Sequence, residues 1–460
     1  MDYVPHTDKD KQEMLREIGV PSTEALFKAV PKELIGVSPK IPKALSEIEL
    51  LDLLRKLSNR NYNLSQYSSF LGAGAYEHFI PSVVEHLASR GEFVTCYTPY
   101  QAEASQGTLQ AIYEFQTLIC ELTAMDAANA SLYDGASALA EAALLAIRHT
   151  ERNKVVVSRA IHPEYREVLK TYLRPLGAVI LEAEAPQGIT DPKGLKALVD
   201  GDTAAVLIQN PNFFGCLEEV DALGDVSHEK GAFLIACVNP ISLGVLKPPG
   251  EYGAEIAVGE AQPLGNHLSY GGPHVGFFAV KKELVRKMPG RLVGATTDLE
   301  GRRGFVLTLQ AREQHIRRHR ATSNICTNQN LCALRACIYL CALGREGIKE
   351  LAELNLQKSH YAAEKVFSIQ GFQPLFQKPF FNEFAVRLPK GIEAEFLNGQ
   401  VLQKGIIGGL PLRGFYPELE GAMLFCVTET KTRADIDSLV NVLKEVTEGH
   451  LAEAKLSGWV

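Results

Sequence analysis

"AAVLIQNPNFFGCLEEVDALGDVSHEKGAFLIACV", residues 204–238, decides the fold. It starts with a short apolar run, AAVLIQN (204–210), and ends with another, AFLIACV (232–238). Between them, DALGDVSHEKG (221–231) has the pattern of a helix or a connection. Apolar runs of this length are typical of parallel strands that are buried on both faces of a sheet.

The same alternation begins further upstream. KVVVS (154–158) and GAVILEA (177–183) are apolar runs, and PEYREVLKTYLRPL (163–176) lies between them as a helix. Strands that alternate with helices in this way predict a mainly parallel α/β sheet covered on both faces. Ligands of such sheets bind outside the carboxyl ends of the strands, so the candidate site is expected there.

Two regions of different character flank the predicted sheet. Residues 1–60 form amphipathic helices by pattern, including STEALFKAV (22–30), which opens on a capping serine, and ALSEIELLDLLRKLSNR (44–60). We expect this arm to bury its apolar face. A long apolar helix (328–344) ends at Gly344 and is followed by a second helix, then by two strands joined by a glycine-rich turn, and by a final amphipathic helix. We predict an N-terminal helical arm (1–60), a large α/β domain (61–328) and a small C-terminal α+β domain (329–460).

Charge and hydropathy exclude two classes of protein. The formal net charge of -7 argues against nucleic-acid binding, because phosphate contact requires a basic face. The sequence has no run of about 18 apolar residues that would span a membrane. Its first residues, MDYVPHTDKDKQ (1–12), are polar and charged, unlike a signal peptide.

Cysteine usage indicates the compartment. The nine cysteines are scattered without a CxxC pair, so we expect buried free thiols and no structural metal. Free thiols fit a reducing compartment, and we expect a cytoplasmic protein.

Several blocks of sequence together carry a family resemblance. They are EMLREIGVPSTEALF (13–27), YTPYQAEASQGTLQAIYEFQTLICELTAMDAANASLYDGASALAEA (97–142), GEAQPLGNHLSYGGPHVGFF (259–278) and REQHIRRHRATSNICTNQ (312–329). Over nearly its whole length the chain resembles the glycine decarboxylase P-protein family of the glycine cleavage system. The match is to the N-terminal half of the long single-chain form, which is the separate subunit 1 of the split form.

The resemblance implies a fold and an activity. The fold is that of the PLP-dependent transferases of fold type I, which are similar to aspartate aminotransferase. The activity is that of glycine dehydrogenase (aminomethyl-transferring), which decarboxylates glycine and passes the aminomethyl group to the lipoyl arm of H-protein. In the split form this chain would pair with subunit 2, as α2β2, and subunit 2 would hold pyridoxal phosphate (PLP) covalently.

The floor of this chain's own pocket lacks both anchors that PLP needs. A lysine binds the cofactor covalently, and a carboxylate pairs with its pyridinium nitrogen. By strand position, Asn239 stands near the carboxylate position and Pro263 near the lysine position. Lys247 is the alternative, as a displaced lysine of a free-standing aminotransferase, although GVLKPPGEYG (244–253) has the composition of an exposed turn.

The helix that begins in DGASALAEA (134–142) allows two interpretations. Its first backbone N–H groups could hold a phosphate. Alternatively, it is an ordinary helix start capped by Asp134 or Ser137, the relic of a phosphate site.

The resemblance further implies that each active site is completed by loops of the neighbouring chain. We expect one wall of the partner's active site to be formed by Tyr97, Thr98, Tyr100, Gln101 and Glu103. The alternative is that the two tyrosines are core residues. Ser323, Asn324 and Thr327 are expected to bind the partner's PLP phosphate, with helix capping as the alternative for Thr327.

A basic cluster precedes that loop. Its arginines are Arg312, Arg317, Arg318 and Arg320. One of them would pair with the glycine carboxylate, or the whole cluster would attract H-protein. The alternative is a solvated charged face without a binding role. His319 departs from the family pattern there. His267 and His274 flank a tight turn, and we interpret both as turn residues. A non-catalytic scaffold with the same fold remains the second functional hypothesis.

Overall fold

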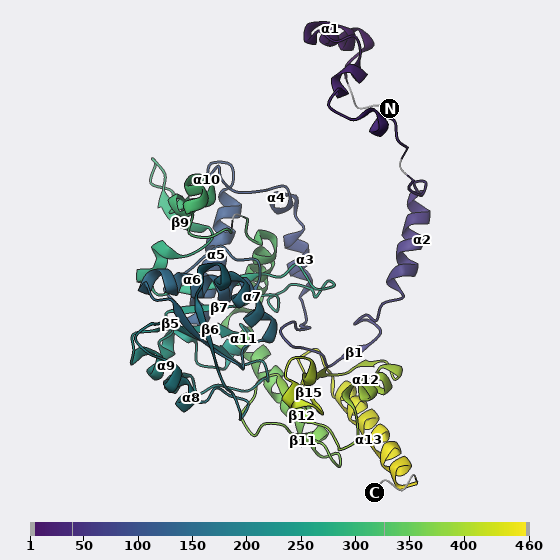
Figure 1. Ribbon diagram of the computed structural model, residues 1–460, viewed down its shortest axis with the longest axis vertical. Helices are drawn as coiled ribbons and strands as arrows, with labels where there is room; N and C mark the ends of the chain where they lie inside the picture. The colour runs from purple at the N-terminus through teal and green to yellow at the C-terminus, as the bar shows by residue number, and fades with distance from the viewer. Residues whose placement is uncertain (1–4, 39, 326, 457–460) are drawn as a thin grey trace. The chain divides into compact units, whose positions relative to one another are not determined.

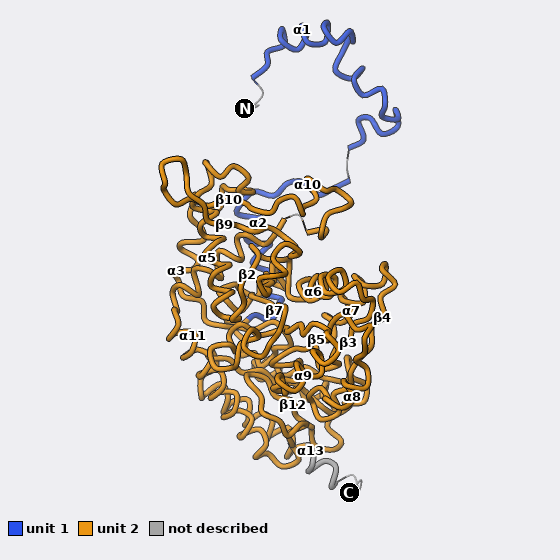
Figure 2. The backbone as a smooth tube through the Cα atoms, turned by 90° about the vertical axis from the view of Figure 1, so that its left-hand side faces the viewer, with its two compact units in different colours: residues 1–63 blue, residues 64–460 orange. Residues whose placement is uncertain are grey.

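The computed structural model of the protein describes residues 5–38, 40–325 and 327–456 (Figure 1). Its contacts divide the chain into two units, residues 1–63 and 64–460 (Figure 2). The outer ends of the predicted first and third domains, residues 1–4 and 457–460, lie outside the described residues. The domain boundary expected at residue 328 stays a prediction.

The first unit contains two α-helices, each started by a capping box. In α1 (Asp8–Ile18) the cap is Thr7, and Gly19, with φ 78°, ends the helix. In α2 (Glu47–Ser58) the cap is Ser46. A short 3₁₀ helix, Thr23–Phe27, replaces the α-helix predicted after Ser22, and the Ser22 side chain makes no capping bond.

The second unit is built on a seven-stranded sheet of order β2-β8-β7-β6-β5-β3-β4. Strands β3 to β7 pair in parallel, whereas β8 is antiparallel to both β7 and β2. The bounds are β2 (Ala127–Ala128), β3 (Lys154–Ser158), β4 (Val179–Ala183), β5 (Thr203–Asn210), β6 (Phe233–Val238), β7 (Ile256–Glu260) and β8 (Gly276–Val280). The mainly parallel sheet expected from the sequence is confirmed.

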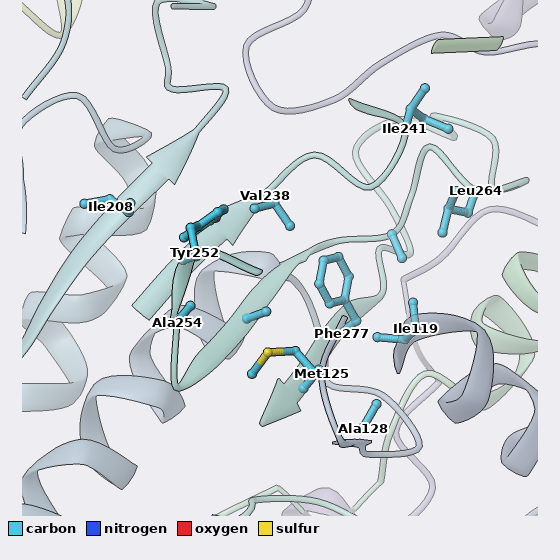
Figure 3. Packing of buried hydrophobic residues seen from close by; sticks show 14 of the residues in the cluster. Ile119, Met125, Ala128, Ile208, Val238, Ile241, Tyr252, Ala254, Leu264 and Phe277 are labelled. Carbon is cyan, nitrogen blue, oxygen red and sulfur yellow. The ribbon is translucent and has the colours of Figure 1, made fainter. Parts of the chain in front are cut away.

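Alternating residues of β5 explain why this strand is apolar throughout. Val206 and Ile208 pack with residues of α5, α8, α9 and α11, whereas Ala205 and Leu207 pack with residues of α6 and α7. Figure 3 shows part of the first cluster, where Phe277 of β8 lies beside Ile119 of α5. A strand buried on both faces needs no polar alternation, and this is the pattern in residues 204–210.

Helices connect and cover these strands. Their bounds are α3 (Ser82–Ala88), α4 (Gly91–Val94), α5 (Gln106–Thr123), α6 (Gly135–Thr150), α7 (Pro163–Leu173), α8 (Pro192–Leu198), α9 (Val220–His228), α10 (Gln314–Arg317) and α11 (Asn330–Phe367). Helix α11 has non-helical backbone at Gly344, with φ 62°, where the sequence predicted one helix to end and another to start. The described helices include none long and apolar enough to cross a membrane.

The C-terminal part has its own four-stranded antiparallel sheet, of order β11-β12-β15-β14. Its elements are β11 (Gln373–Pro374), β12 (Glu383–Arg387), α12 (Ala394–Gln403), β14 (Leu410–Pro411), β15 (Ala422–Cys426) and α13 (Arg433–Leu456). Two further pairs lie outside these sheets: the hairpin of β9 (Leu292–Thr297) with β10 (Arg303–Thr308), and β1 (Ser68–Ser69) with β13 (Ile406–Ile407).

Candidate functional site

Neutral side chains follow β6 and β7, where a PLP enzyme would have its anchors. Asn239 comes directly after β6, and its amide oxygen accepts the backbone N–H of Ile241 at 3.0 Å. Pro263 is buried just beyond β7. Neither position supplies a charge or an amine.

Lys247 cannot replace the missing lysine. Its Nζ lies 2.6 Å from Asp221 Oδ1, and 44% of its side chain is exposed. An exposed amine that is paired with a surface carboxylate is not a lysine held in a cofactor pocket. The free-standing aminotransferase hypothesis is therefore dropped.

The first turn of α6 is already occupied by a carboxylate of the same chain. Glu260, the last residue of β7, is 7% exposed. Its Oε2 accepts the N–H of Gly135 at 3.0 Å, and its Oε1 accepts the N–H groups of Gln262 and Val275, both at 2.9 Å. The sequence did not predict this contact. Because the donors are used and the site carries a negative charge, a phosphate is disfavoured there.

Aromatic side chains crowd the same place. The His162 ring stacks on the Tyr165 ring with centroids 4.8 Å apart, and burial lowers the pKa of His162. A Cβ added at Gly135 would lie 2.7 Å from the Tyr165 hydroxyl oxygen. With no amine, no pyridinium partner and a filled helix terminus, the residues present do not fit PLP.

Another face of the second unit is open. A cavity of about 280 Å³ lies between the segment before α5, helix α5 itself and the start of α11. Most of its lining is apolar, while one end carries the polar side chains of Arg291, Thr327, Asn328 and Gln329. Tyr97 lines it as well, so one residue of the predicted wall, Tyr97, and one of the predicted phosphate-binding loop, Thr327, share this cavity, whereas the other predicted residues do not line it.

Arg291 holds this region together. The residue is 4% exposed, and its guanidinium donates to the Tyr100 hydroxyl at 3.1 Å and to the Asn328 side chain at 3.3 Å. It also lies 5.3 Å from the centroid of the Tyr100 ring. Its Nε is 3.9 Å from Glu313 Oε2, and neither this Nε nor Glu313 Oε1 has a hydrogen-bond partner among the described residues.

The wall residues are exposed rather than packed in a core. Tyr97 is 85% and Tyr100 50% exposed, so the alternative interpretation of both as core tyrosines is wrong. Thr98 is half-buried, and Gln101 and Glu103 are exposed. Tyrosines that are exposed beside a cavity are suited to contact another molecule.

The second predicted segment is held from α6. Ser323 donates its hydroxyl hydrogen to Glu141 Oε1 at 2.7 Å, and burial raises the pKa of Glu141. Asn324 and Thr327 are exposed. The capping alternative for Thr327 is not observed, because Gln329 is the N-cap of α11.

The basic cluster separates into one structural arginine and three exposed ones. Arg312 donates to the backbone carbonyls of Met288, Gly290 and Leu309, and burial lowers its pKa. Arg317, Arg318 and Arg320, like His319 between them, are exposed.

The two turn histidines differ in their surroundings. His267 is exposed, whereas His274 Nδ1 lies 3.3 Å from Glu260 Oε2, and this hydrogen bond raises the pKa of His274.

The cysteines were expected to be buried free thiols. Those within the described residues are free: Cys216, Cys237, Cys332, Cys337 and Cys426 are buried, while Cys341 is exposed. Cys326 lies outside the described residues. The described residues contain no group of His, Cys, Asp and Glu side chains that could hold a metal.

Comparison with known proteins identifies the family. A sequence model of the family "Glycine cleavage system P-protein" matches residues 1–443. The chain belongs to this family. That is the family expected from the sequence.

Two relatives illustrate the match. The probable glycine dehydrogenase (decarboxylating) subunit 1 of Desulfitobacterium hafniense is 55% identical and covers 97% of this chain and 100% of its own length. The protein of the same name from Geobacillus kaustophilus is 53% identical and covers 97% and 99%, respectively.

Solved structures agree with this P-protein assignment. A crystal structure of glycine decarboxylase (P-protein) of the glycine cleavage system, in inhibitor-bound form, has a TM-score of 0.89 and 48% identity, and the match covers 97% of this chain and 100% of that chain. The sphingosine-1-phosphate lyase Bpss2021 of Burkholderia pseudomallei, with a TM-score of 0.66 at 16% identity, supports the fold alone. The fold class expected for a PLP-dependent transferase is confirmed.

Proposed function

We propose that this P-protein chain is the subunit of glycine decarboxylase that does not bind PLP covalently. With subunit 2, as α2β2, it decarboxylates glycine and transfers the aminomethyl group to the lipoyl arm of H-protein. The observation that carries the proposal is a contrast: Glu260 accepts the N–H of Gly135 at the start of α6, whereas the cavity beside Tyr97 and Thr327 is open. The assembly works in the cytoplasm.

The chain's own residues serve the partner's site. PLP, when bound by subunit 2, supplies an electron sink for the decarboxylation. The hydroxyls of Tyr97 and Tyr100 orient the substrate, while Ser323, Asn324 and Thr327 bind the cofactor phosphate from across the interface. Arg291 keeps Tyr100 and Asn328 in place through its two hydrogen bonds. The exposed arginines Arg317, Arg318 and Arg320 attract the acidic surface of H-protein.

The isolated chain is expected to bind no PLP covalently. After incubation with PLP and gel filtration without reduction, the chain should carry no cofactor absorbance, since no amine lies at the pocket. Mixed with subunit 2, it should raise glycine-dependent CO2 exchange well above the rate of subunit 2 alone. Covalent PLP on this chain, or glycine turnover by it alone, would contradict the proposal.

Tyr100→Phe is expected to lower the exchange rate of the reconstituted enzyme by about 10-fold, because one positioned hydroxyl is lost. Tyr361→Phe is the matched control, since the Tyr361 hydroxyl also accepts a hydrogen bond from an arginine, Arg433 Nε, at 3.2 Å but lies in the C-terminal part. Its rate should stay near that of the native enzyme. If Tyr100→Phe also retains the native rate while the subunits co-elute, the chain is a scaffold instead.

A further inference from the structure

The carboxylate of Glu260 has the surroundings of a bound anion. Three backbone N–H groups donate to it at 2.9 to 3.0 Å, and they come from three separate segments: Gly135 at the start of α6, Gln262 after β7, and Val275 before β8. His274 Nδ1 is a fourth neighbour, 3.3 Å from Oε2. Backbone N–H groups that converge in this way are the donors with which proteins hold phosphate and carboxylate groups.

The helix terminus adds to this attraction. α6 runs for 16 residues from Gly135, and the partial positive charge at its start favours a negative group. Asp134 takes the N–H of Ser137, so Glu260 and Asp134 together use two different N–H groups of the first turn. The position is close-packed, since a Cβ at Gly135 would lie 3.0 Å from the backbone nitrogen of Glu260.

We propose that Glu260 is a built-in anion that replaces a bound phosphate at the start of α6. It keeps α6, β7 and β8 joined without a cofactor, which allows this chain to retain the fold of a PLP enzyme while its own site is closed. Helix α6 also carries Glu141, which accepts the hydroxyl of Ser323. The role of Glu260 can be tested on this chain alone and does not rest on the proposed function.

Glu260→Ala tests this role on the full-length chain. The three N–H groups lose their acceptor, and we expect the midpoint of thermal unfolding in sodium chloride to fall by about 5 °C. Sodium acetate or inorganic phosphate, at the same ionic strength, should then raise the midpoint with a logarithmic dependence on concentration. Acetate is expected to act more strongly, because the donors are arranged around two carboxylate oxygens.

Glu141→Ala is the matched control. Glu141 is also a buried carboxylate of this region, with 1% exposure, but the partner of its Oε1 is a hydroxyl rather than a set of backbone N–H groups. Acetate and phosphate should act on this variant no more than on the native chain. If they also act no more on Glu260→Ala, or if that variant keeps the native midpoint in chloride, the proposal is overturned.

Glu260→Gln keeps the test decisive if the alanine variant does not fold. Its amide fills the space but is neutral, so we expect a lowered midpoint that does not respond to acetate. A native midpoint for Glu260→Gln would show that the negative charge has no role.

Discussion

Arg291→Met is expected to destabilise the isolated chain by about 3–5 kcal/mol, because it removes the buried guanidinium beside the carboxylate of Glu313, whose other basic neighbours are the exposed His315, 3.7 Å away, and Arg312. Glu313 is 8% exposed, so water cannot replace the lost charge. The exchange rate of the enzyme reconstituted with subunit 2 should fall by about 100-fold, since Tyr100 and Asn328 both lose their hydrogen-bond donor. Urea unfolding measures the first effect, and glycine-dependent CO2 exchange measures the second.

A double variant separates these two effects. In Arg291→Met/Glu313→Gln no buried charge is left unpaired, so most of the stability should return. The rate should stay low, because Tyr100 and Asn328 still lack the guanidinium. The loss should appear in kcat as well as in the KM for glycine. If the rate returns together with the stability, Arg291 is only a structural residue.

The fold was predictable because its central strands are apolar along their whole length. β3, β5 and β6 are buried on both faces, so their apolar character appears in the sequence without knowledge of their partners. The helix start at Asp134 was predictable for a similar reason, since capping is a contact within one turn. The β9–β10 hairpin was missed because β9, LVGATT, is partly exposed and contains no continuous apolar run.

The candidate site was only partly predictable, because its contacts join distant segments. Arg291 meets residue 100 and residue 328, and no local pattern distinguishes it from a surface arginine. The loss of the lysine could be recognised from one position, Pro263. That the pocket is also filled could not, because Glu260 contacts Gly135 across 125 positions of sequence. A carboxylate at the end of the apolar strand β7 was the one available signal.

The two pockets together indicate how one fold serves two roles. A sheet with a helix terminus at its carboxyl edge is a ready anion site, and it must be either used or neutralised. In this chain the edge is neutralised by its own residue, while the segments beside Tyr97 and Thr327 stay open to solvent.

Glu383→Gln is expected to remove a pH dependence of stability. Glu383 is 3% exposed on β12; its Oε1 accepts the N–H of Ala73 at 2.6 Å, and its Oε2 accepts the Tyr76 hydroxyl at 2.7 Å. Burial raises the pKa of Glu383 from 4.5 to about 7. Because the folded state holds the proton more tightly, the stability from this group is fully present below about pH 4.5 and is lost as the pH rises through about 7.

The pKa shift of Glu383 sets the size of the expected change in stability. A shift from 4.5 to about 7 corresponds to on the order of 3 kcal/mol, measured as the difference in free energy of unfolding between pH 5 and pH 8. Burial also raises the pKa of Glu218 to about 7, so Glu383→Gln should flatten the profile only in part, and adding Glu218→Gln should flatten it further. Glu395→Gln, on the exposed side of α12, should leave the profile unchanged. A native profile for Glu383→Gln would show that Glu383 is ionised throughout this range.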